Sequence, residues 1–266
     1  MPFLFSLVMF RWRVGTLFKS IKTMKKKRFL LLAFAALLSV GLASCEKDND
    51  STGGSNSNSN GGGSGQTPGD YVDLGLPSGL LWATRNIGAE SPEDYGDYFA
   101  WGETQPKSVY NWSTYRYCNG AFDQLTKYCY NSSYGYNGFT DNLTTLQPSD
   151  DAATANWGNG WRTPTMEEWQ ELRDNTTSIW TTRNGVYGRL LTASNGNSLF
   201  LPAAGGRSGS ELLGAGEDGD YWSASLYSDY PNGAWCFYFS SGDQFVDDGG
   251  GRRNGGQSVR AVCSAR

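Results

Sequence analysis

"PTMEEWQELRDN" at residues 164–175 is the stretch that decides the fold class, because it carries the clearest helical signature of the chain. Thr165 and Glu168 have the S/T-x-x-E spacing of a capping box, in which each side chain binds the other residue's backbone amide. Three apolar side chains recur at helical spacing on one side of this segment: Met166, Trp169 and Leu172. The stretch therefore predicts a short helix that packs one face against a core.

The sequence around this helix is rich in β-forming residues and glycine turns. "SDDAATANW" (149–157) predicts a second short helix, with Ser149 or Asp150 as its cap. "YVDLGLPSGLLWATR" (71–85) has two extended runs around a Pro-Ser-Gly turn, which is typical of a hairpin. Further β-rich runs stand at 197–205, 221–227, 234–240 and 257–265. This order of strands, helices and strands predicts an α+β domain of mostly antiparallel strands and loops with one or two short helices.

Composition divides the chain into three regions. Residues 71–266 hold nine of the 10 tryptophans and are long enough to bury the core of one domain. Residues 51–70 have no aromatic, aliphatic or basic side chain, which predicts a flexible Gly/Ser/Asn linker. Residues 1–44 hold eight of the 22 basic residues and no acidic one. We therefore expect a leader at 1–44, a tether at 45–70 and one folded domain at 71–266.

The leader has the order of an export signal, with basic residues at 25–28 followed by an apolar run at 29–42. This run is shorter than the roughly 20 apolar residues that a spanning helix needs. "LASC" (42–45) resembles the lipobox of bacterial lipoproteins, which implies cleavage before Cys45 and lipidation of its sulfur. Acyl chains on that sulfur would hold the domain on a membrane. The alternative is a short membrane-anchor helix.

Two questions about this signal stay open: where translation starts, and whether the acidic residues after Cys45 direct export to the cell surface. A true start at Met24 would make residues 1–23 an upstream extension of the reading frame, whereas the alternative is a genuinely long leader. The acidic "EKDND" (46–50) resembles the surface-export signal of Bacteroidota-type lipoproteins, although an ordinary solvated tether would also be charged. We expect an outer-membrane protein, anchored through lipid on Cys45 and facing the cell exterior.

The charge distribution argues against a nucleic-acid partner. All 26 acidic residues follow Cys45, so the mature chain is strongly acidic. Binding to a phosphate backbone needs clustered Lys and Arg side chains. We therefore expect no nucleic-acid binding.

Four ordered blocks resemble the Fibrobacter succinogenes major paralogous domain family. They are LPSGLLWATRNIGAESPEDYGDYFAWGET (76–104), WGNGWRTPTMEEWQEL (157–172), GDYWSAS (219–225) and SVRAVC (258–263), and they are spread over nearly the whole length of 71–263. That family is similar to the wider C-type-lectin-like fold, which also includes the formylglycine-generating enzymes. The resemblance implies a single C-type-lectin-like domain whose N- and C-terminal strands lie together, with long loops on one side. It also implies surface or adhesion-like roles.

Catalysis has little support in the residue content. The chain has no histidine, which excludes Ser-His-Asp and Cys-His catalysis and histidine-containing zinc sites. By fold analogy, a formylglycine-generating type of oxidase would need a reactive cysteine pair, for which Cys236 and Cys263 are the candidates. Nothing near them resembles the motifs of those enzymes. We expect no enzyme activity and no catalytic residue.

The cysteines that follow Cys45 are even in number, which in an exported domain suggests disulfides. Cys118 and Cys129 are close in sequence, and Cys236 and Cys263 lie in predicted strands that would be neighbours. We expect these two pairs. The alternative is buried thiols that behave as small apolar side chains.

Calcium is the cofactor that the acidic loops allow, because Ca²⁺ takes six to eight oxygen ligands, often from loop carboxylates and carbonyls. The candidate ligands are Asp218, Asp220, Asp247 and Asp248. Neither of their loops matches the Asp-x-Asp-x-Asp-Gly pattern, and the sugar-coordinating triplets of C-type lectins are missing. The alternative is solvated surface turns, and no other cofactor is expected.

Loops on a rigid scaffold are the best place for ligand contacts. Sugars offer apolar faces that stack on aromatic side chains, with polar groups fixing their orientation. We predict a site formed by loops 204–220 and 241–257, while four tryptophans are predicted as core residues: Trp82, Trp161, Trp169 and Trp222. The contact candidates are Arg207, Asp218, Asp220, Tyr227, Asp247, Asp248, Arg252 and Arg253.

The sequence thus predicts a surface-exposed outer-membrane lipoprotein with a non-catalytic binding or adhesion domain. Its expected partners are the membrane, through the lipid on Cys45, and a glycan or surface-protein ligand. One alternative is a structural component of the cell surface without a small ligand. The oxidase is a third interpretation.

Overall fold

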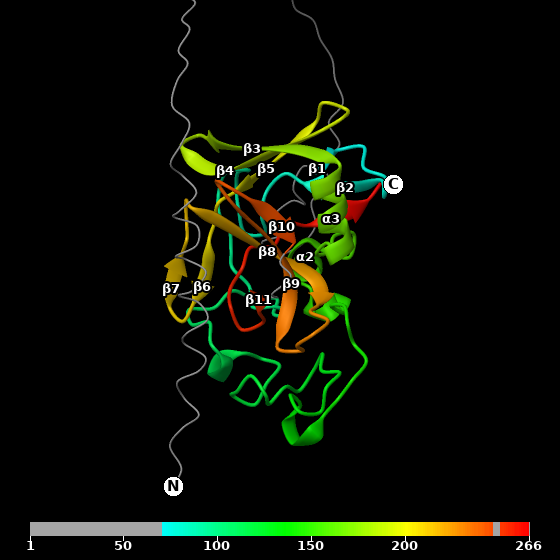
Figure 1. The fold of residues 1–266 in the computed structure, drawn as a ribbon, viewed down its shortest axis with the longest axis vertical. Helices are drawn as coiled ribbons and strands as arrows, with labels where there is room; N and C mark the ends of the chain where they lie inside the picture. Colours follow the sequence, from blue (N-terminus) through cyan, green and yellow to red (C-terminus); the bar gives the residue numbers. More distant parts are fainter. Residues whose placement is uncertain (1–70, 247–250, 266) are drawn as a thin grey trace, which may run out of the picture. The chain divides into compact units, whose positions relative to one another are not determined.

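Short antiparallel strands dominate the computed structural model, which describes residues 71–246 and 251–265 (Figure 1). The predicted leader, Cys45 and tether lie outside the described residues. Within the described ranges, no helix is long and apolar enough to cross a bilayer. The small sheets and few short helices confirm the predicted α+β class.

The strands are β1 (Tyr71–Asp73), β2 (Leu80–Ala83), β3 (Thr176–Arg183), β4 (Val186–Ala193), β5 (Ser198–Pro202), β6 (Gly206–Ser208), β7 (Glu211–Leu213), β8 (Asp218–Leu226), β9 (Gly233–Ser240), β10 (Gln244–Val246), β11 (Gly251–Arg252) and β12 (Val262–Ser264). The α-helices are α2 (Ala152–Trp157) and α3 (Met166–Asp174). Three 3-10 turns complete the set: η1 (Trp112–Thr114), η2 (Tyr136–Gly138) and η3 (Pro148–Asp150).

The first and last strands share one antiparallel sheet of order β1-β2-β12. Trp82 of β2 lies opposite Val72 on one side and opposite Val262 on the other. The β1–β2 turn closes where Gly79, at φ 69°, donates its amide to the Leu76 carbonyl at 2.9 Å. This confirms the predicted hairpin and the expected meeting of the terminal strands.

Helix α3 begins with the predicted capping box. The Glu168 amide donates to the Thr165 hydroxyl at 3.3 Å, and the Thr165 amide donates to the Glu168 carboxylate at 2.8 Å. Trp169 and Leu172 are fully buried, whereas Met166 is only partly buried. The Trp169 ring stacks on Phe237 of β9 with centroids 4.8 Å apart, so the helix packs against the large sheet.

Helix α2 has a different cap from the one expected. Asp151 is the N-cap, and its carboxylate accepts from the Ala153 amide at 2.8 Å. Asp150 is engaged elsewhere, because its carboxylate accepts from the Lys127 ammonium and the Tyr128 hydroxyl, both at 2.6 Å. The prediction of Ser149 or Asp150 as cap is therefore wrong by one or two residues.

The β3–β4 hairpin is an element that the sequence analysis did not predict. Its turn residues Asn184 and Gly185 have φ values of 48° and 83°, as a two-residue type I′ turn requires. An Asn-Gly pair between two β-rich runs is a strong signal for such a turn, and residues 176–193 carry it. Strand β5 pairs with β4 and completes a three-stranded sheet.

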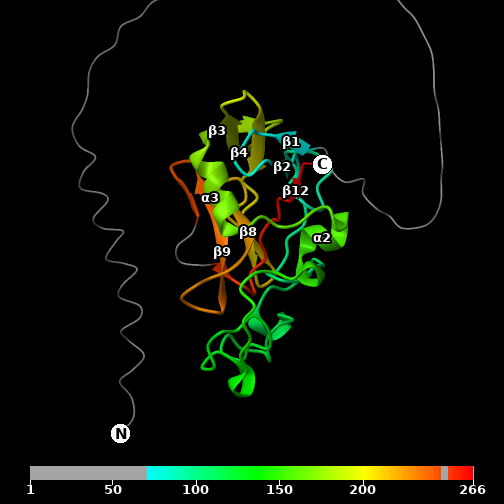
Figure 2. The same cartoon turned by 90° about the vertical axis from the view of Figure 1, so that its right-hand side faces the viewer.

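Two clusters of buried side chains form the core around the β8–β9 pair. One holds Trp82, Trp169 and Phe237, and the other holds Trp101 and Trp222. The four tryptophans predicted as core are all buried, which confirms that expectation: Trp82, Trp161, Trp169 and Trp222. Figures 1 and 2 show the β3–β4–β5 sheet at one end of this core and the green loops around η1 and η2 at the other. The sheet end carries the candidate site.

Candidate functional site

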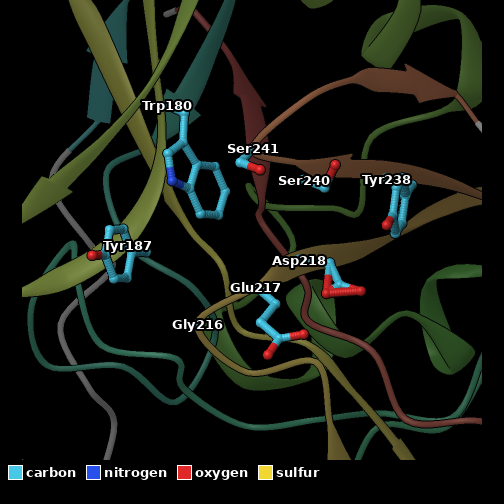
Figure 3. A pocket seen from close by; sticks show the side chains of 8 residues that line it. All are labelled: Trp180, Tyr187, Gly216, Glu217, Asp218, Tyr238, Ser240 and Ser241. Carbon is cyan, nitrogen blue, oxygen red and sulfur yellow. The ribbon is translucent and has the colours of Figure 1, made fainter. Parts of the chain in front are cut away.

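An open cleft of about 550 Å³ lies where three segments meet beside the β3–β4 hairpin (Figure 3). The hairpin supplies two aromatic side chains, the start of β8 and the residue before it supply two carboxylates, and the end of β9 with the residue after it supplies hydroxyl groups. The lining residues are Trp180, Tyr187, Gly216, Glu217, Asp218, Tyr238, Ser240 and Ser241. The cleft is therefore aromatic on one side and acidic on the other.

The strand register places the two aromatic residues together. Trp180 of β3 lies opposite Arg189 of β4, and Tyr187 is two residues from Arg189, on the same face of the hairpin. The rings of Trp180 and Tyr187 are nearly parallel, at 12°, with centroids 5.8 Å apart. Trp180 rests edge-on against buried Phe239 at 6.4 Å, while Tyr187 is 50% exposed. The pair forms a supported aromatic surface that is partly open to solvent, chiefly at Tyr187.

A tight glycine turn brings the carboxylates to the opposite side. The Asp218 amide donates to the Gly214 carbonyl at 2.9 Å, and Gly214 has φ 69°. A Cβ atom on Gly214 would lie 2.6 Å from Oδ1 of Asp218. Only glycine fits both this backbone conformation and this close approach. The turn thus places Asp218, with Glu217 before it, at the edge of the cleft.

Asp218 carries a charge that the described protein does not neutralise. Its Oδ1 atom is buried without a hydrogen-bond partner, although the Tyr238 hydroxyl binds the same carboxylate. Burial, and then the neighbouring charge of Glu217, raise the pKa of Asp218 above its ordinary value, while the bond from Tyr238 opposes that rise. No ion pair to either carboxylate occurs among the described residues. The acidic side would therefore favour a ligand that donates hydrogen bonds or carries positive charge.

Arg189 holds the hydroxyl-bearing side in place. Its Nε and Nη2 atoms donate to the Ser240 carbonyl at 3.1 and 2.8 Å, and Nη2 also donates to the Asp243 carbonyl at 3.1 Å. Nη1 donates to the Ser178 hydroxyl of β3 at 3.3 Å. Burial lowers the pKa of this guanidinium, an effect that the charge of Asp243 opposes. Arg189 therefore ties the hairpin to the β9–β10 turn and has its donors directed into the protein.

The predicted site on loops 204–220 and 241–257 stays a prediction, although both segments contribute residues to this cleft. Asp218 from the first loop and Ser241 from the second line the same cleft. Asp220 lies two residues further along β8, opposite Tyr238, on the same face as Asp218 but outside the lining. Asp247 and Asp248 lie outside the described residues.

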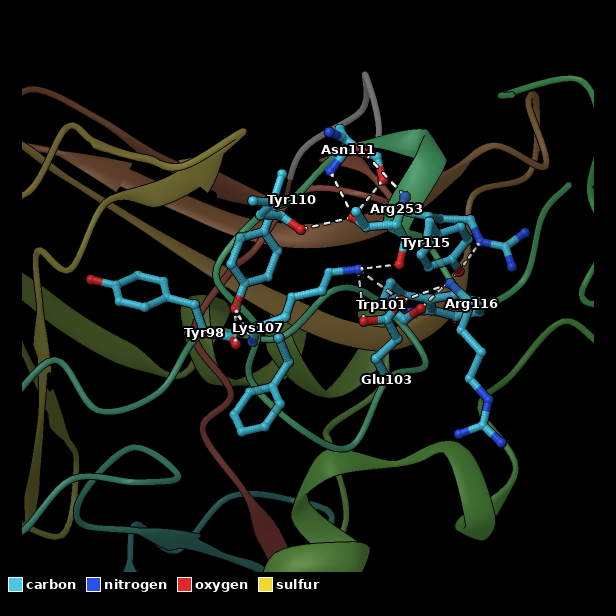
Figure 4. Close-up of polar contacts among 12 residues, drawn as sticks. Tyr98, Trp101, Glu103, Lys107, Tyr110, Asn111, Tyr115, Arg116 and Arg253 are labelled. Atoms are coloured by element: carbon cyan, nitrogen blue, oxygen red, sulfur yellow. Dashed lines mark hydrogen bonds and ion pairs between the residues drawn. The ribbon is translucent and has the colours of Figure 1, made fainter. Parts of the chain in front are cut away.

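Arg253 was predicted as a ligand contact, and that prediction is wrong because the side chain is fully buried (Figure 4). Its guanidinium donates to the Tyr115 hydroxyl at 2.9 Å and to the carbonyls of Tyr128, Pro231 and Lys127 at 3.0, 2.7 and 3.0 Å. It also lies over the Trp101, Tyr115 and Tyr128 rings at 5.0 to 5.7 Å. Arg253 is a structural residue.

Three other contact candidates also lie away from the cleft. Tyr227 is buried, with its ring 4.9 Å from that of Trp235, so it cannot present a surface to a ligand. Arg207 lies 5.1 Å above the Tyr98 ring. Arg252 is exposed on β11, opposite Gly233, and does not line the cleft.

The structure forms neither of the two predicted disulfide pairs. Cys118, Cys129, Cys236 and Cys263 are all thiols outside any disulfide. The Cys118 thiol donates to the Trp112 carbonyl at 3.0 Å, and the Cys129 thiol donates to the Asn131 carbonyl at 3.1 Å. Cys236 and Cys263 lie in β9 and β12, which belong to different sheets, whereas the prediction required neighbouring strands.

The calcium prediction remains a prediction at all four of its positions. No group of three or more His, Cys, Asp or Glu side chains within 71–246 and 251–265 could hold a metal ion. The described candidates, Asp218 and Asp220, are therefore not joined there by a third acidic ligand. The other two, Asp247 and Asp248, lie outside these ranges.

Sequence reasoning missed the aromatic half of the cleft. Trp180 and Tyr187 come together only through the hairpin register, and the Asn-Gly turn at 184–185 was the signal that could have revealed it. Tyr238 and Ser240 alternate with buried residues along β9, so their outward orientation follows once the buried face is known.

Comparison of the chain with family models, with curated proteins and with solved structures gives no match in any of the three.

Proposed function

We propose that this domain is a non-catalytic carbohydrate-binding module and that the cleft beside the β3–β4 hairpin is its binding site. The observation that carries the proposal is the juxtaposition of the Trp180–Tyr187 ring pair with the carboxylates of Glu217 and Asp218 around one open cleft. Small-ligand sites combine aromatic side chains with placed polar groups, and this cleft has both kinds among its lining residues.

The chemistry of a sugar matches both sides of the cleft. A pyranose ring has an apolar C–H face that stacks on aromatic rings, and exposed Tyr187 with partly buried Trp180 beside it offers an aromatic surface for such stacking. The hydroxyl groups at the edge of the sugar ring can donate hydrogen bonds to the carboxylates of Glu217 and Asp218. Ser240 and Ser241 offer further hydrogen-bonding groups at the rim.

The proposed fold family is C-type-lectin-like. The pairing of β12 with β2, which joins the two ends of the domain, supports this assignment. The four sequence blocks that resemble the major paralogous domain family support it as well. In this interpretation, the domain is a scaffold that displays its binding groups on loops and on one hairpin.

The proposed location is the outer face of the outer membrane. The lipobox-like "LASC", the acidic residues after Cys45 and the Gly/Ser/Asn tether support a domain held away from a lipid surface. Protease treatment of intact cells tests the location, since a surface domain is released without membrane disruption. Release only after the outer membrane is opened would contradict it.

A structural surface component without a small ligand is the second candidate. The loops around η2 expose four aromatic side chains at 37–49%, namely Phe122, Tyr130, Tyr136 and Phe139, which would suit contacts with other surface proteins. Such a protein would bind no glycan.

Glycan-array binding by the mature lipoprotein in detergent tests the proposal. Trp180→Ala should weaken binding by at least about tenfold, or ~1.4 kcal/mol, because it removes half of the stacking surface. Tyr230→Ala is the matched control, since this tyrosine is 55% exposed and lies outside the cleft. Equal loss with both variants, or no binding by the wild-type protein, would argue against the cleft as a sugar site.

A further inference from the structure

The two charged side chains among the described residues that line the cleft are both acidic. Glu217 and Asp218 line it, and Asp220 follows on the same face of β8. None of the described residues that line the cleft is Lys or Arg. Arg189 lies opposite Trp180 in the hairpin, and its guanidinium donates to the carbonyls of Ser240 and Asp243. A ligand that enters the cleft therefore meets negative charge.

The charge of Asp218 is also poorly accommodated by the protein itself. Its Oδ1 atom is buried with no hydrogen-bond partner, and Glu217 adds a like charge beside it. A carboxylate in this position is costly unless something neutralises it. A cation held beside Glu217 and Asp218 would relieve both the burial cost and the mutual repulsion.

We propose that the cleft selects glycans with a free, protonated amino group, so that its preferred ligands are N-unsubstituted amino sugars. This inference rests on the proposed carbohydrate-binding function and specifies the sugar class. The ammonium group would lie against Glu217 and Asp218 while the sugar ring covers Trp180 and Tyr187. An ammonium near an aromatic face gains further attraction from the ring quadrupole.

The same geometry excludes two related sugar classes. An N-acetylated amino sugar has the same ring but carries no charge, so it loses the attraction to the two carboxylates. A uronic or sialic acid brings a second negative charge into an acidic cleft and is repelled. A lysine-rich peptide would satisfy the carboxylates, yet it would leave the nearly parallel pair of Trp180 and Tyr187 without a flat ligand face.

Isothermal titration of the mature lipoprotein with matched oligosaccharides tests this proposal. The probes are a β-linked glucosamine oligomer, its fully N-acetylated form, a uronic-acid oligomer and a lysine-rich peptide, at mildly acidic pH where the amine is protonated. The free-amine oligomer should bind at least about tenfold more tightly than the acetylated one, with higher salt reducing this preference.

Variants separate charge recognition from stacking. Glu217→Gln with Asp218→Asn should abolish the preference for the free amine and leave the weaker binding of the acetylated oligomer. Trp180→Ala should weaken both oligomers. Glu211→Gln is the matched charge control, because this glutamate is exposed on β7 and outside the cleft lining. It should keep the wild-type preference.

The outcomes distinguish the two levels of the proposal. Equal or tighter binding of the acetylated oligomer would overturn the amino-sugar inference and leave the carbohydrate function standing. Binding of the lysine-rich peptide without any oligosaccharide would overturn both and indicate a cationic protein ligand. No binding of any probe would also overturn both.

Discussion

A single buried arginine joins loop segments that have few regular backbone pairings of their own. Arg253 donates to the carbonyls of Lys127, Tyr128 and Pro231 and to the hydroxyl of Tyr115. Those acceptors lie in three segments of the chain, at 115, at 127–128 and at 231, and their hydrogen bonds are buried or partly buried. The guanidinium therefore supplies hydrogen bonds to buried loop carbonyls and so connects the loops to one another.

Arg253→Met should lower the free energy of unfolding by about 3 kcal/mol or more, because several acceptors would be left without donors inside the protein. Thermal unfolding followed by circular dichroism measures this loss. Arg252→Met is the control, since the neighbouring arginine is exposed and its removal should shift stability by less than about 0.5 kcal/mol. Similar losses in both variants would contradict the structural role of Arg253.

The raised pKa of Asp218 makes the stability of the fold depend on pH, and the direction of this dependence can be predicted. Its pKa is raised in the folded protein by burial and by Glu217, so the folded state binds this proton more tightly than the unfolded state. The contribution of Asp218 to stability therefore increases as pH falls from the raised pKa towards the ordinary carboxyl pKa. Asp218→Asn should raise the melting temperature at neutral pH by about 1–3 °C and have no such advantage in strong acid.

Melting curves across this pH range check the Asp218 prediction. Asp229→Asn, which removes one exposed carboxylate at a distant turn, serves as the control. A melting temperature of Asp218→Asn below that of the wild-type protein at neutral pH would show that the carboxylate stabilises the fold instead.

At the scale of elements, the β3–β4 hairpin links stability to the candidate site. Its strands carry Trp180 and Tyr187, and Arg189 anchors it to the β9–β10 turn. The tip of the hairpin is held as well, since Arg183 pairs with Glu93 at 3.4 Å. The hairpin is therefore a positioned element, and its turn geometry decides where the aromatic pair lies.

Gly185→Ala should destabilise this hairpin by about 1–2 kcal/mol, the cost of a left-handed conformation for a residue with a Cβ atom. No steric clash contributes, because a Cβ atom at Gly185 would meet nothing within 4 Å. Gly160→Ala is the control, because that glycine also has open space around it but is not among the residues with a positive φ. Urea unfolding should show the difference, and equal stability of the two variants would refute the turn argument.

At the scale of the whole domain, stability comes from two buried clusters around β8 and β9 without a covalent cross-link. The described cysteines are thiols, and two of them are fully or almost fully buried: Cys129 and Cys236. Burial raises the pKa of the Cys118 and Cys129 thiols, which keeps them in the less reactive neutral form at neutral pH. Aromatic packing takes the place that disulfides have in small exported domains.

The structure predicts that a reducing agent leaves the melting temperature unchanged. Alkylation of the denatured, unreduced protein should add a label at each of Cys118, Cys129, Cys236 and Cys263, while a lipidated Cys45 would remain blocked. Mass spectrometry counts the labels. Recovery of two or no labels would mean that the protein forms disulfides, as the even cysteine count first suggested.

The sequence alone determined features that depend on neighbours along the chain. The capping box of α3, the first hairpin and the buried tryptophans follow from local spacing and hydrophobicity, and the structure confirms them. The leader and the tether remain predictions of the same local kind. Local patterns suffice here because capping and turn formation involve residues only two to four positions apart.

Only the tertiary structure decided which polar and aromatic residues face a common cleft. Arg252 and Arg253 are identical neighbours in sequence, yet one is exposed and the other is fully buried. Arg252 ends β11, whereas Arg253 begins the turn after it and has its guanidinium bonded to carbonyls that are far away in the sequence. Trp180 and Asp218 are far apart along the chain and meet through long-range packing that no local pattern encodes. The site is a product of register and packing, and these are properties of the folded chain as a whole.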